Sequence, residues 1–306
     1  MLQKRRGELF LIAAAFLFSF NGIVSKLVLT SSLSALRLAQ VRSTGSLIIL
    51  FFIVFFRSRE KLRTTKKEIP QLAIFGALGI AAVQLGYFIA ISHMHVSIAL
   101  IIEFTAPIWI VLWIKYVRKL FVPRDMWIAI FLAFFGLLFV AQVWKGQTLS
   151  TVGVIAATLD AFALSIYFLM GEKLSKTRDT ESLTFYGFAF ASLSWLILLP
   201  IWKFPFRVFS EKINLQGIFS HYDSYGWVLI LWIVVFGTII PYLLVVTGIK
   251  SLSASTSSVI GMLEPVLAGI IAWWWLGESW KPLQILGGCF VITGILIADR
   301  ARIKAH

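Results

Sequence analysis

Charged residues are scarce in this chain of 306 residues. They account for 14% of the sequence, against 59% hydrophobic residues and a mean hydropathy of +0.89. A soluble protein of this size carries about 25% charged residues. The charges present are too few to cover a water-facing surface. We therefore expect lipid to cover most of the molecule and no soluble domain of useful length to exist.

Cysteine and the signatures of several enzyme classes are also missing. The single cysteine, Cys289, excludes an intrachain disulfide. The sequence has no Gly-x-x-x-x-Gly-Lys-Ser/Thr loop for ATP and no His-Glu-x-x-His zinc motif. His93 and His95 could pair on a metal, but no third ligand is in view, so we predict no metal and no cofactor. A membrane-embedded enzyme remains the weaker alternative.

Positive charge is in excess, with 28 Lys and Arg against 14 Asp and Glu. These charges sit in short clusters between apolar runs, as in the basic cytoplasmic loops of membrane proteins, so we expect no nucleic-acid partner. Ten apolar runs are long enough to cross about 30 Å of hydrocarbon. They lie near residues 9–29, 35–56, 70–92, 97–114, 126–144, 152–171, 183–202, 226–249, 254–276 and 282–298. This pattern predicts an all-α, multi-pass protein of a prokaryotic-type inner (cell) membrane, with ten transmembrane helices.

The distribution of Lys and Arg sets the direction of the ten spans. With the N-terminus in the cytoplasm, 20 of the 28 basic residues fall in cytoplasmic segments and six in outer segments. The remaining two, Arg37 and Arg42, lie within the second span. Because basic residues are enriched in cytoplasmic loops, both termini are predicted to be cytoplasmic.

An internal repeat divides the chain in two. At an offset of 158, the matches are Ser97-Ile98-Ala99 with Ser255-Thr256-Ser257, Pro107 with Pro265, and Phe135-Gly136-Leu137 with Thr293-Gly294-Ile295. Earlier segments match at an offset of 146, including Ser19 with Ser165. We predict two units, residues 1–146 and 147–306, of five spans each. Because five is odd, the second unit would cross the membrane upside down, as in the inverted repeats of secondary transporters.

The last third of the chain resembles the EamA family of the drug/metabolite transporter superfamily. The resemblance is carried by Glu264-Pro265, Trp275-Leu276-Gly277-Glu278, Pro282, Gln284, Gly287-Gly288 and Gly294. Glu103-Phe104-Thr105-Ala106-Pro107 and Pro241-Tyr242 are similar to the amino-acid exporters of this family. The fourth span departs from the pattern, because it ends in Lys115-Tyr116 where many relatives have Gly-Glu. The resemblance implies a cavity near the midplane, between spans 1, 3 and 4 of one half and 6, 8 and 9 of the other.

Glu103 is the leading candidate for a residue that takes part in transport. It lies within the fourth span, where a charge costs about 2.5–3.5 kcal/mol on insertion scales and normally faces a cavity or a partner. Pro107 cannot donate a hydrogen bond to the Glu103 carbonyl, which leaves a polar kink beside the carboxylate. We interpret Glu103 as a substrate-binding and proton-coupling residue and include Pro107 in the site. The alternative is a buried glutamate bonded to a neighbouring helix.

Further polar residues within the spans complete the candidate substrate site. Arg42 could meet a substrate carboxylate or form a salt bridge with a buried glutamate. Glu264 could bind substrate or anchor the kink at Pro265. The uncharged candidates, each of which could instead brace neighbouring helices, are Asn21, Gln84, Tyr87, Tyr167 and Tyr242. Asp160 is assigned a structural pairing, with proton relay as the alternative.

These features together favour a secondary active transporter. We expect it to move a small polar or amphipathic metabolite by alternating access, with amino-acid export as the leading hypothesis and proton coupling as an option. An uncoupled facilitator or an importer of another metabolite is the alternative. The expected partners are the small-molecule substrate and the lipid bilayer, and the chain is expected to be a monomer or a homodimer.

Overall fold

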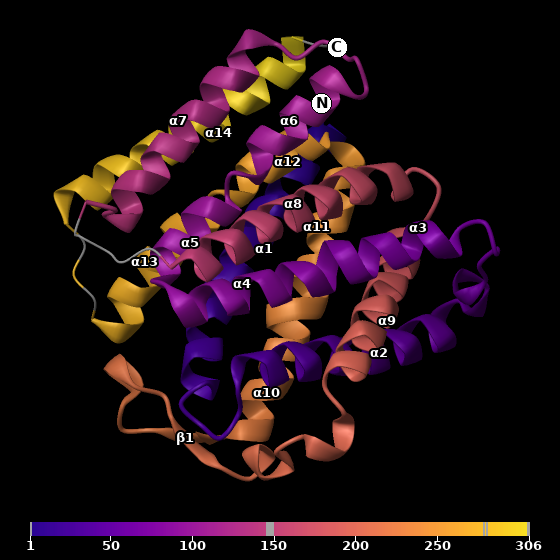
Figure 1. Cartoon of the computed structure of the whole chain (residues 1–306), viewed down its shortest axis with the longest axis vertical. Coiled ribbons are helices and arrows are strands. Elements are labelled where there is room, and N and C mark those ends of the chain that lie inside the picture. The colour runs from indigo at the N-terminus through magenta and orange to yellow at the C-terminus, as the bar shows by residue number, and fades with distance from the viewer. Residues whose placement is uncertain (1, 145–149, 278, 280, 305–306) are drawn as a thin grey trace.

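The computed structural model describes residues 2–144, 150–277, 279 and 281–304. Ten of its helical segments are long and apolar enough to cross a membrane, which confirms the predicted number of spans. They are Arg5–Val28, Ala35–Arg57, Ile69–His93, Ile98–Tyr116, Arg124–Ala141, Thr151–Leu174, Thr180–Leu198, Gly226–Ser251, Ala254–Leu276 and Pro282–Ala301. The chain is therefore an all-α membrane protein. Figure 1 shows the helices gathered into one bundle.

Six spans are continuous helices. These are α1 (Leu2–Val28), α2 (Ala35–Arg57), α7 (Arg124–Ala141), α8 (Thr151–Leu174), α9 (Thr180–Leu198) and α14 (Pro282–Lys304). Side chains that accept hydrogen bonds from the first turn fix where several helices begin. Ser34 caps α2 through Arg37 N, and Asp179 caps α9 through Ser182 N. The seventh span ends at Leu198 rather than near residue 202, because Pro200 follows.

The other four spans are interrupted. The third consists of α3 (Ile69–Ala73), the π-helical segment η2 (Ile74–Ala81) and α4 (Ala82–His93). The eighth consists of α10 (Gly226–Val234), the π-helical segment η6 (Val235–Ile239) and α11 (Ile240–Ser251). The fourth is split into α5 (Val96–Glu103) and α6 (Ala106–Tyr116), and the ninth into α12 (Ala254–Gly261) and α13 (Glu264–Leu276).

These interruptions recur at the offset of the sequence repeat. Both ends of α5 and α12 differ by 158 residues, and so do the starts of α6 and α13. The two π-helical segments also end 158 residues apart, at Ala81 and Ile239. The correspondence therefore extends from residue types to the positions where the backbone departs from an α-helix. The predicted inversion of the two units, their division near residue 146 and the cytoplasmic location of the termini remain predictions.

Spans 5 and 10 pack closely through small residues. A Cβ atom on Gly136 would lie 2.6 Å from the Gly287 carbonyl oxygen, and one on Gly294 would lie 2.7 Å from the Ala129 carbonyl oxygen. Since Gly136 matches Gly294 and Ala129 matches Gly287 at the offset of 158, these two contacts are repeat mates. In Figure 1, α7 and α14 run together along one edge of the bundle.

The long loop between spans 7 and 8 has structure that the sequence did not predict. It contains the short helices η3 (Ile201–Lys203), η4 (Phe206–Phe209) and η5 (Gly217–Phe219), and the strands β1 (Lys212–Asn214) and β2 (Asp223–Tyr225). The two strands pair antiparallel, with Lys212 opposite Tyr225. Trp275 Nε1 donates a hydrogen bond to the Leu215 carbonyl oxygen at 2.9 Å, which ties this loop to the end of α13.

Candidate functional site

The fourth span breaks directly after Glu103. This residue is the last of α5, and Phe104 and Thr105 separate it from α6, which has Pro107 in its first turn. The predicted kink is thus a two-residue break between helices. The Thr105 hydroxyl donates to the Ile102 carbonyl oxygen at 2.6 Å and accepts from Trp109 Nε1 at 3.1 Å. Local side chains therefore satisfy part of the opened backbone, as a break inside a membrane requires.

The ninth span breaks directly before Glu264. Here α12 ends at Gly261, and Glu264 is the first residue of α13, followed by Pro265. The free N–H groups at the start of a helix favour a nearby negative charge. The two breaks lie at equivalent positions of the repeat, but they place their carboxylates on opposite sides of the gap.

A serine from the other half contacts each of these breaks. The Ser19 hydroxyl, on α1, lies 2.8 Å from the Glu264 carbonyl oxygen and shares its one hydrogen between that oxygen and the Ala15 carbonyl oxygen at 2.6 Å. The Ser165 hydroxyl, on α8, lies 3.2 Å from the Ala106 carbonyl oxygen and shares its hydrogen with the Ala161 carbonyl oxygen at 2.7 Å. Ser19 and Ser165 are mates at the offset of 146, and Ala106 and Glu264 at 158, so the two hydrogen bonds are repeat mates. Sequence analysis noted the serine pair only as a repeat match and did not include it in the site.

Asn21 and Tyr167 form a second pair of cross-half contacts. A Cβ atom on Gly237, in η6, would lie 2.1 Å from Asn21 Oδ1. A Cβ atom on Gly79, in η2, would lie 3.1 Å from the Tyr167 Cα atom. Gly79 and Gly237 are 158 residues apart, so each candidate residue packs on the π-helical segment of the opposite half. A side chain at position 237 would displace Asn21, whereas one at position 79 would need the helices to shift by only a few tenths of an ångström.

The charged candidates come together inside the bundle. Glu103 interacts electrostatically with Glu264, and Asp160 with Glu103. Arg42, on α2, interacts with Glu264 and with the tyrosines at 87 and 242. The structure therefore unites the charged candidates from spans 2, 4 and 9. Of the two alternatives for Arg42, the salt bridge to a buried glutamate is not formed in this conformation, since no ion pair involves Arg42 within the described part of the chain.

Five of these residues keep accessible surface although they lie deep in the bundle. They are Arg42, Tyr87, Glu103, Tyr242 and Glu264, and each is half-buried. We call this group of five the central cluster. Pro107, by contrast, is buried at the start of α6 and shapes the break.

Arg42 is held by the π-helical segment of span 8. Its Nε donates to Thr238 Oγ1 at 3.1 Å, and its Nη2 donates to the Gly237 carbonyl oxygen at 3.3 Å. Thr238 is fully buried, and its hydroxyl donates to the Ile233 carbonyl oxygen at 2.8 Å. Sequence analysis missed Thr238, because a lone threonine in an apolar span gives no signal of its partner.

Gln84 and Asp160 show two different outcomes for buried polar groups. Gln84 Oε1 accepts hydrogen bonds from Ser43 Oγ and Trp195 Nε1, both at 3.1 Å, and so joins spans 2, 3 and 7. Neither carboxyl oxygen of Asp160 has a hydrogen-bond partner among the described residues, although the residue is 1% exposed. The structural pairing expected for Asp160 is therefore not formed in this conformation. Gly86 on α4 packs directly against it.

Aromatic rings form one wall beside the central cluster. Tyr242 meets Phe188, Phe18 and Tyr167 edge-on, with ring centroids 5.0, 5.4 and 5.7 Å apart. Edge-to-face contacts of this kind stabilise packing by about 0.5–1.5 kcal/mol each. Tyr242 is thus packed between rings from spans 1, 6 and 7.

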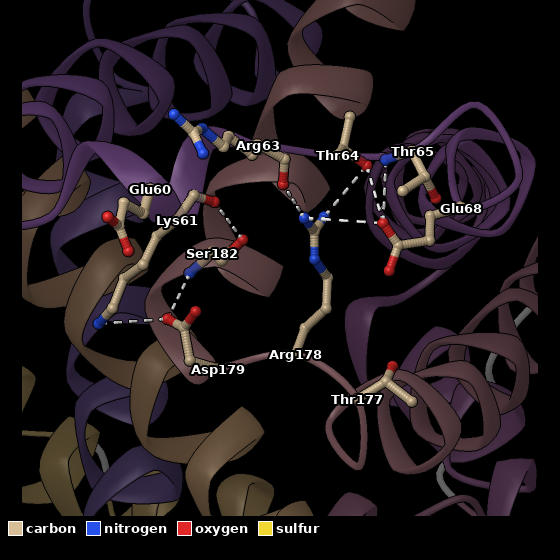
Figure 2. Close-up of a pocket in the computed structure, with 10 residues that line it drawn as sticks. All are labelled: Glu60, Lys61, Arg63, Thr64, Thr65, Glu68, Thr177, Arg178, Asp179 and Ser182. Atoms are coloured by element: carbon tan, nitrogen blue, oxygen red, sulfur yellow. Dashed lines mark hydrogen bonds and ion pairs between the residues drawn. The ribbon is translucent and has the colours of Figure 1, made fainter.

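A separate polar pocket of about 410 Å³ lies at the ends of spans 2, 3, 6 and 7 (Figure 2). Lys61 pairs with Asp179 at 3.4 Å on one side of it, and Arg178 lies 3.9 Å from Glu68 on the other. The hydrogen bond that Lys61 donates to Glu181 raises the pKa of Lys61, and the hydrogen bond that Glu68 accepts from the Thr65 backbone N–H lowers the pKa of Glu68. These charges pair with one another across the two halves, so we assign the pocket to the helix ends rather than to a substrate site.

Comparison with known proteins identifies relatives along the whole chain. The EamA-like transporter family matches residues 5–142 and 151–298. An uncharacterized transporter of Archaeoglobus fulgidus is 23% identical, over 85% of this chain and 90% of its own length. The uncharacterized inner membrane transporter YicL of Salmonella typhimurium is 22% identical, over 97% and 96%. The threonine/homoserine exporter RhtA of Salmonella typhimurium is 27% identical, over 87% and 81%.

The fold is also found among solved structures. A chain described only as "Crystal structure of protein" aligns with a TM-score of 0.77 at 16% identity and covers 98% of both chains. The relatives point to a transporter rather than an enzyme, and to a multi-pass membrane protein. The chain belongs to the EamA-like transporter family.

Proposed function

We propose that the chain is a secondary active carrier that exports amino acids by alternating access, with proton coupling at Glu103. One observation carries the proposal. The central cluster places the guanidinium of Arg42 near Glu264, and Glu264 near Glu103, without an ion pair between them in the described part of the chain. Oppositely charged groups that are close but unpaired suit a ligand that carries both charges.

An α-amino acid at neutral pH is such a ligand. Its carboxylate would accept hydrogen bonds from Arg42, whose planar guanidinium suits carboxylate geometry. Its ammonium group would lie toward Glu103 and Glu264. The likeness to the threonine/homoserine exporter RhtA, at 27% identity, supports amino acids as the substrate class. The aromatic wall at Tyr242 would bound the space left for the side chain.

Alternating access is supported by the repeat-mate contacts between the halves. Ser19 and Ser165 each hold the break of the opposite half through equivalent hydrogen bonds. In an inverted pair, a conformational change that loosens one of these contacts on one side of the membrane would tighten its mate on the other. The breaks themselves lie beside the central cluster, so movement at the breaks would change access to Glu103 and Glu264.

Proton coupling is assigned to Glu103 because it is half-buried at a helix break and makes no ion pair within the described residues. A carboxyl group in this position can exchange a proton for the ammonium of the substrate. Proton entry from the outside and substrate exit would then use the same group in alternation. An uncoupled facilitator or importer would use the central cluster without this exchange.

Flux in proteoliposomes tests the proposal. Purified protein is reconstituted, and labelled L-threonine is followed first in counterflow and then under an imposed pH gradient. The proposal expects saturable counterflow that excess unlabelled threonine abolishes. It also expects an imposed pH gradient to drive net movement of threonine in the direction opposite to proton flow. Saturable counterflow that does not respond to the pH gradient would indicate an uncoupled facilitator. Absence of counterflow for threonine, homoserine and a panel of the other amino acids would overturn amino-acid transport.

A further inference from the structure

Arg42 presents one edge of its guanidinium to the protein and leaves the other edge free. The Nε and Nη2 hydrogen bonds, to Thr238 Oγ1 and to the Gly237 carbonyl oxygen, occupy the side-on edge. A guanidinium has five N–H donors in a fixed fork. The end-on edge, formed by one Nη1 donor and the second Nη2 donor, makes no hydrogen bond within the described part of the chain, and neither does the remaining Nη1 donor.

The protein side of this arrangement depends on the π-helical segment η6. The Thr238 hydroxyl donates to Ile233, five residues earlier, which leaves its oxygen oriented to accept from Arg42 Nε. The Gly237 carbonyl accepts from Nη2, and Asn21 packs behind Gly237. Short π-helical segments within α-helices often occur at functional sites. Here the segment provides two hydrogen-bond acceptors on neighbouring residues, and they bind the two donors on the side-on edge of Arg42.

The other half of the repeat does not reproduce this feature. At the offset of 146, the position of Arg42 is taken by Phe188, which is fully buried and packs edge-on against Tyr242. The first half therefore has a cationic side chain at this position, and the second half has an aromatic one. A site with a single fixed cation binds a solute with a defined orientation.

We infer that Arg42 is the oxyanion-recognition residue of the central cluster and that Thr238 positions it, so the transported solute must carry a carboxylate. This inference rests on the proposed function and adds which group of the substrate is required and which residue positions Arg42. The free end-on edge offers two parallel N–H donors, which is the bidentate geometry that carboxylates accept. Thr238 fixes the direction of that edge without touching the solute.

Protection of Arg42 from chemical modification tests the inference. Glyoxal, a reagent no larger than an amino acid, modifies accessible arginines, and mass spectrometry reports the modified fraction of each. Three probes are compared in proteoliposomes: L-threonine, L-threoninamide, which lacks the carboxylate, and propionate, which lacks the ammonium group. Arg37 is the matched control, because it lies on the same helix and its Nη1 already donates to Gln40 Oε1 and the Pro200 carbonyl oxygen.

The inference expects modification of Arg42, protection by L-threonine and propionate, and no protection by L-threoninamide or at Arg37. Protection by propionate without protection by threonine would keep the carboxylate site and reject amino acids as the substrate. Equal protection by threonine and threoninamide would overturn carboxylate recognition. So would an Arg42 that glyoxal cannot modify, since a solute of that size could not reach it either.

The role of Thr238 is tested by two variants. In Thr238→Val the concentration of threonine that protects Arg42 should rise by about tenfold, as expected when a hydrogen bond to a charged group is lost. In Thr238→Ser, which keeps the hydroxyl, protection should match the wild type. If the same concentration of threonine protects Arg42 in both variants and in the wild type, Thr238 does not position Arg42. A lower folded yield with unchanged protection in the folded fraction would assign Thr238 a structural role only.

Discussion

Spans 4 and 9 are broken in the same way, but they carry their charges at different positions. In each, a helix of eight residues is followed by a two-residue break and a second helix, at the same positions of the repeat. In each, a serine of the opposite half bonds to the first residue after the break. Glu103, however, matches Gly261, and Glu264 matches Ala106, so neither carboxylate has a counterpart. The repeat thus provides the scaffold, and single residues that differ between the halves provide the chemistry.

The position of each carboxylate relative to its break has a physical consequence. Glu264 begins α13, where the free N–H groups of the first turn stabilise a negative charge by about 0.3–1 kcal/mol. Glu103 ends α5, where the free carbonyl groups of the last turn oppose one. We therefore propose Glu264 as the fixed charge of the site and Glu103 as the group that exchanges a proton.

The largest effect is expected from Glu103→Gln. The substitution keeps size and hydrogen bonding but removes the titrating group, so amino-acid transport driven by a pH gradient should fall by at least about tenfold, the factor equivalent to roughly 1.4 kcal/mol. Proteoliposome flux measures this loss. Counterflow, which needs no net proton movement, should survive in part. Wild-type transport across the pH range would exclude Glu103 from coupling, and an equal loss at every pH would indicate substrate binding alone.

The packing between spans 5 and 10 should be the next most sensitive feature. A Cβ atom on Gly136 would lie 2.6 Å from backbone of α14, so Gly136→Ala should destabilise the protein by about 1–3 kcal/mol. Thermal unfolding of the purified protein measures this change. Gly22→Ala is the matched control, because nothing lies within 4 Å of the added carbon. Equal stability of the two variants would show that the close α7–α14 contact is not required.

Glu264→Gln should have a smaller effect than Glu103→Gln on pH-driven transport. It removes the charge at the start of α13, and the lost dipole interaction should lower stability by about 0.3–1 kcal/mol. Parallel measurement of flux and thermal unfolding separates the two effects. If Glu264→Gln abolished pH-driven transport and Glu103→Gln did not, the roles assigned to the two carboxylates would be reversed.

The smallest effects are expected from the repeat-mate serines. Ser19→Ala and Ser165→Ala each remove one hydrogen bond between the halves, worth about 0.6 kcal/mol in membrane proteins. Because the bonds are equivalent, the two variants should lose similar stability in thermal unfolding. Their effects on counterflow should also be similar. A loss in only one variant would mean that the two breaks are not mechanically equivalent.

Sequence alone predicted the ten spans and the repeat, because both depend on local composition and on residue spacing. It also predicted a disturbance at Pro107, since proline removes a backbone donor wherever it lies. The extent of the break and the role of Thr238 could not be predicted in the same way. Thr238 bonds to a residue 196 positions away in the chain, and only the packing of spans 2 and 8 brings the two together.

The candidate site was predicted as a set of residue types rather than as an arrangement. Arg42, Glu103 and Glu264 were expected near one another, and the structure unites them. Gln84 lies in the same region but bonds to Ser43 and Trp195, as a bracing residue does. The difference depends on which face of the third span turns toward its neighbours. Span 3 contains a π-helical segment, which rotates the faces on either side of it and defeats a prediction based on helical periodicity.

The two halves are predicted to cross the membrane in opposite directions, and thiol labelling tests this arrangement. Single cysteines are placed in a Cys289→Ser background at Ser31 and Ser220, and at Thr64 and Ser175. The third predicted outer position, Gln147, lies outside the described residues. An impermeant thiol reagent should label Ser31→Cys and Ser220→Cys in intact cells, and Thr64→Cys and Ser175→Cys only after permeabilisation. Labelling of Thr64→Cys and Ser220→Cys from the same side of the membrane would contradict the inversion.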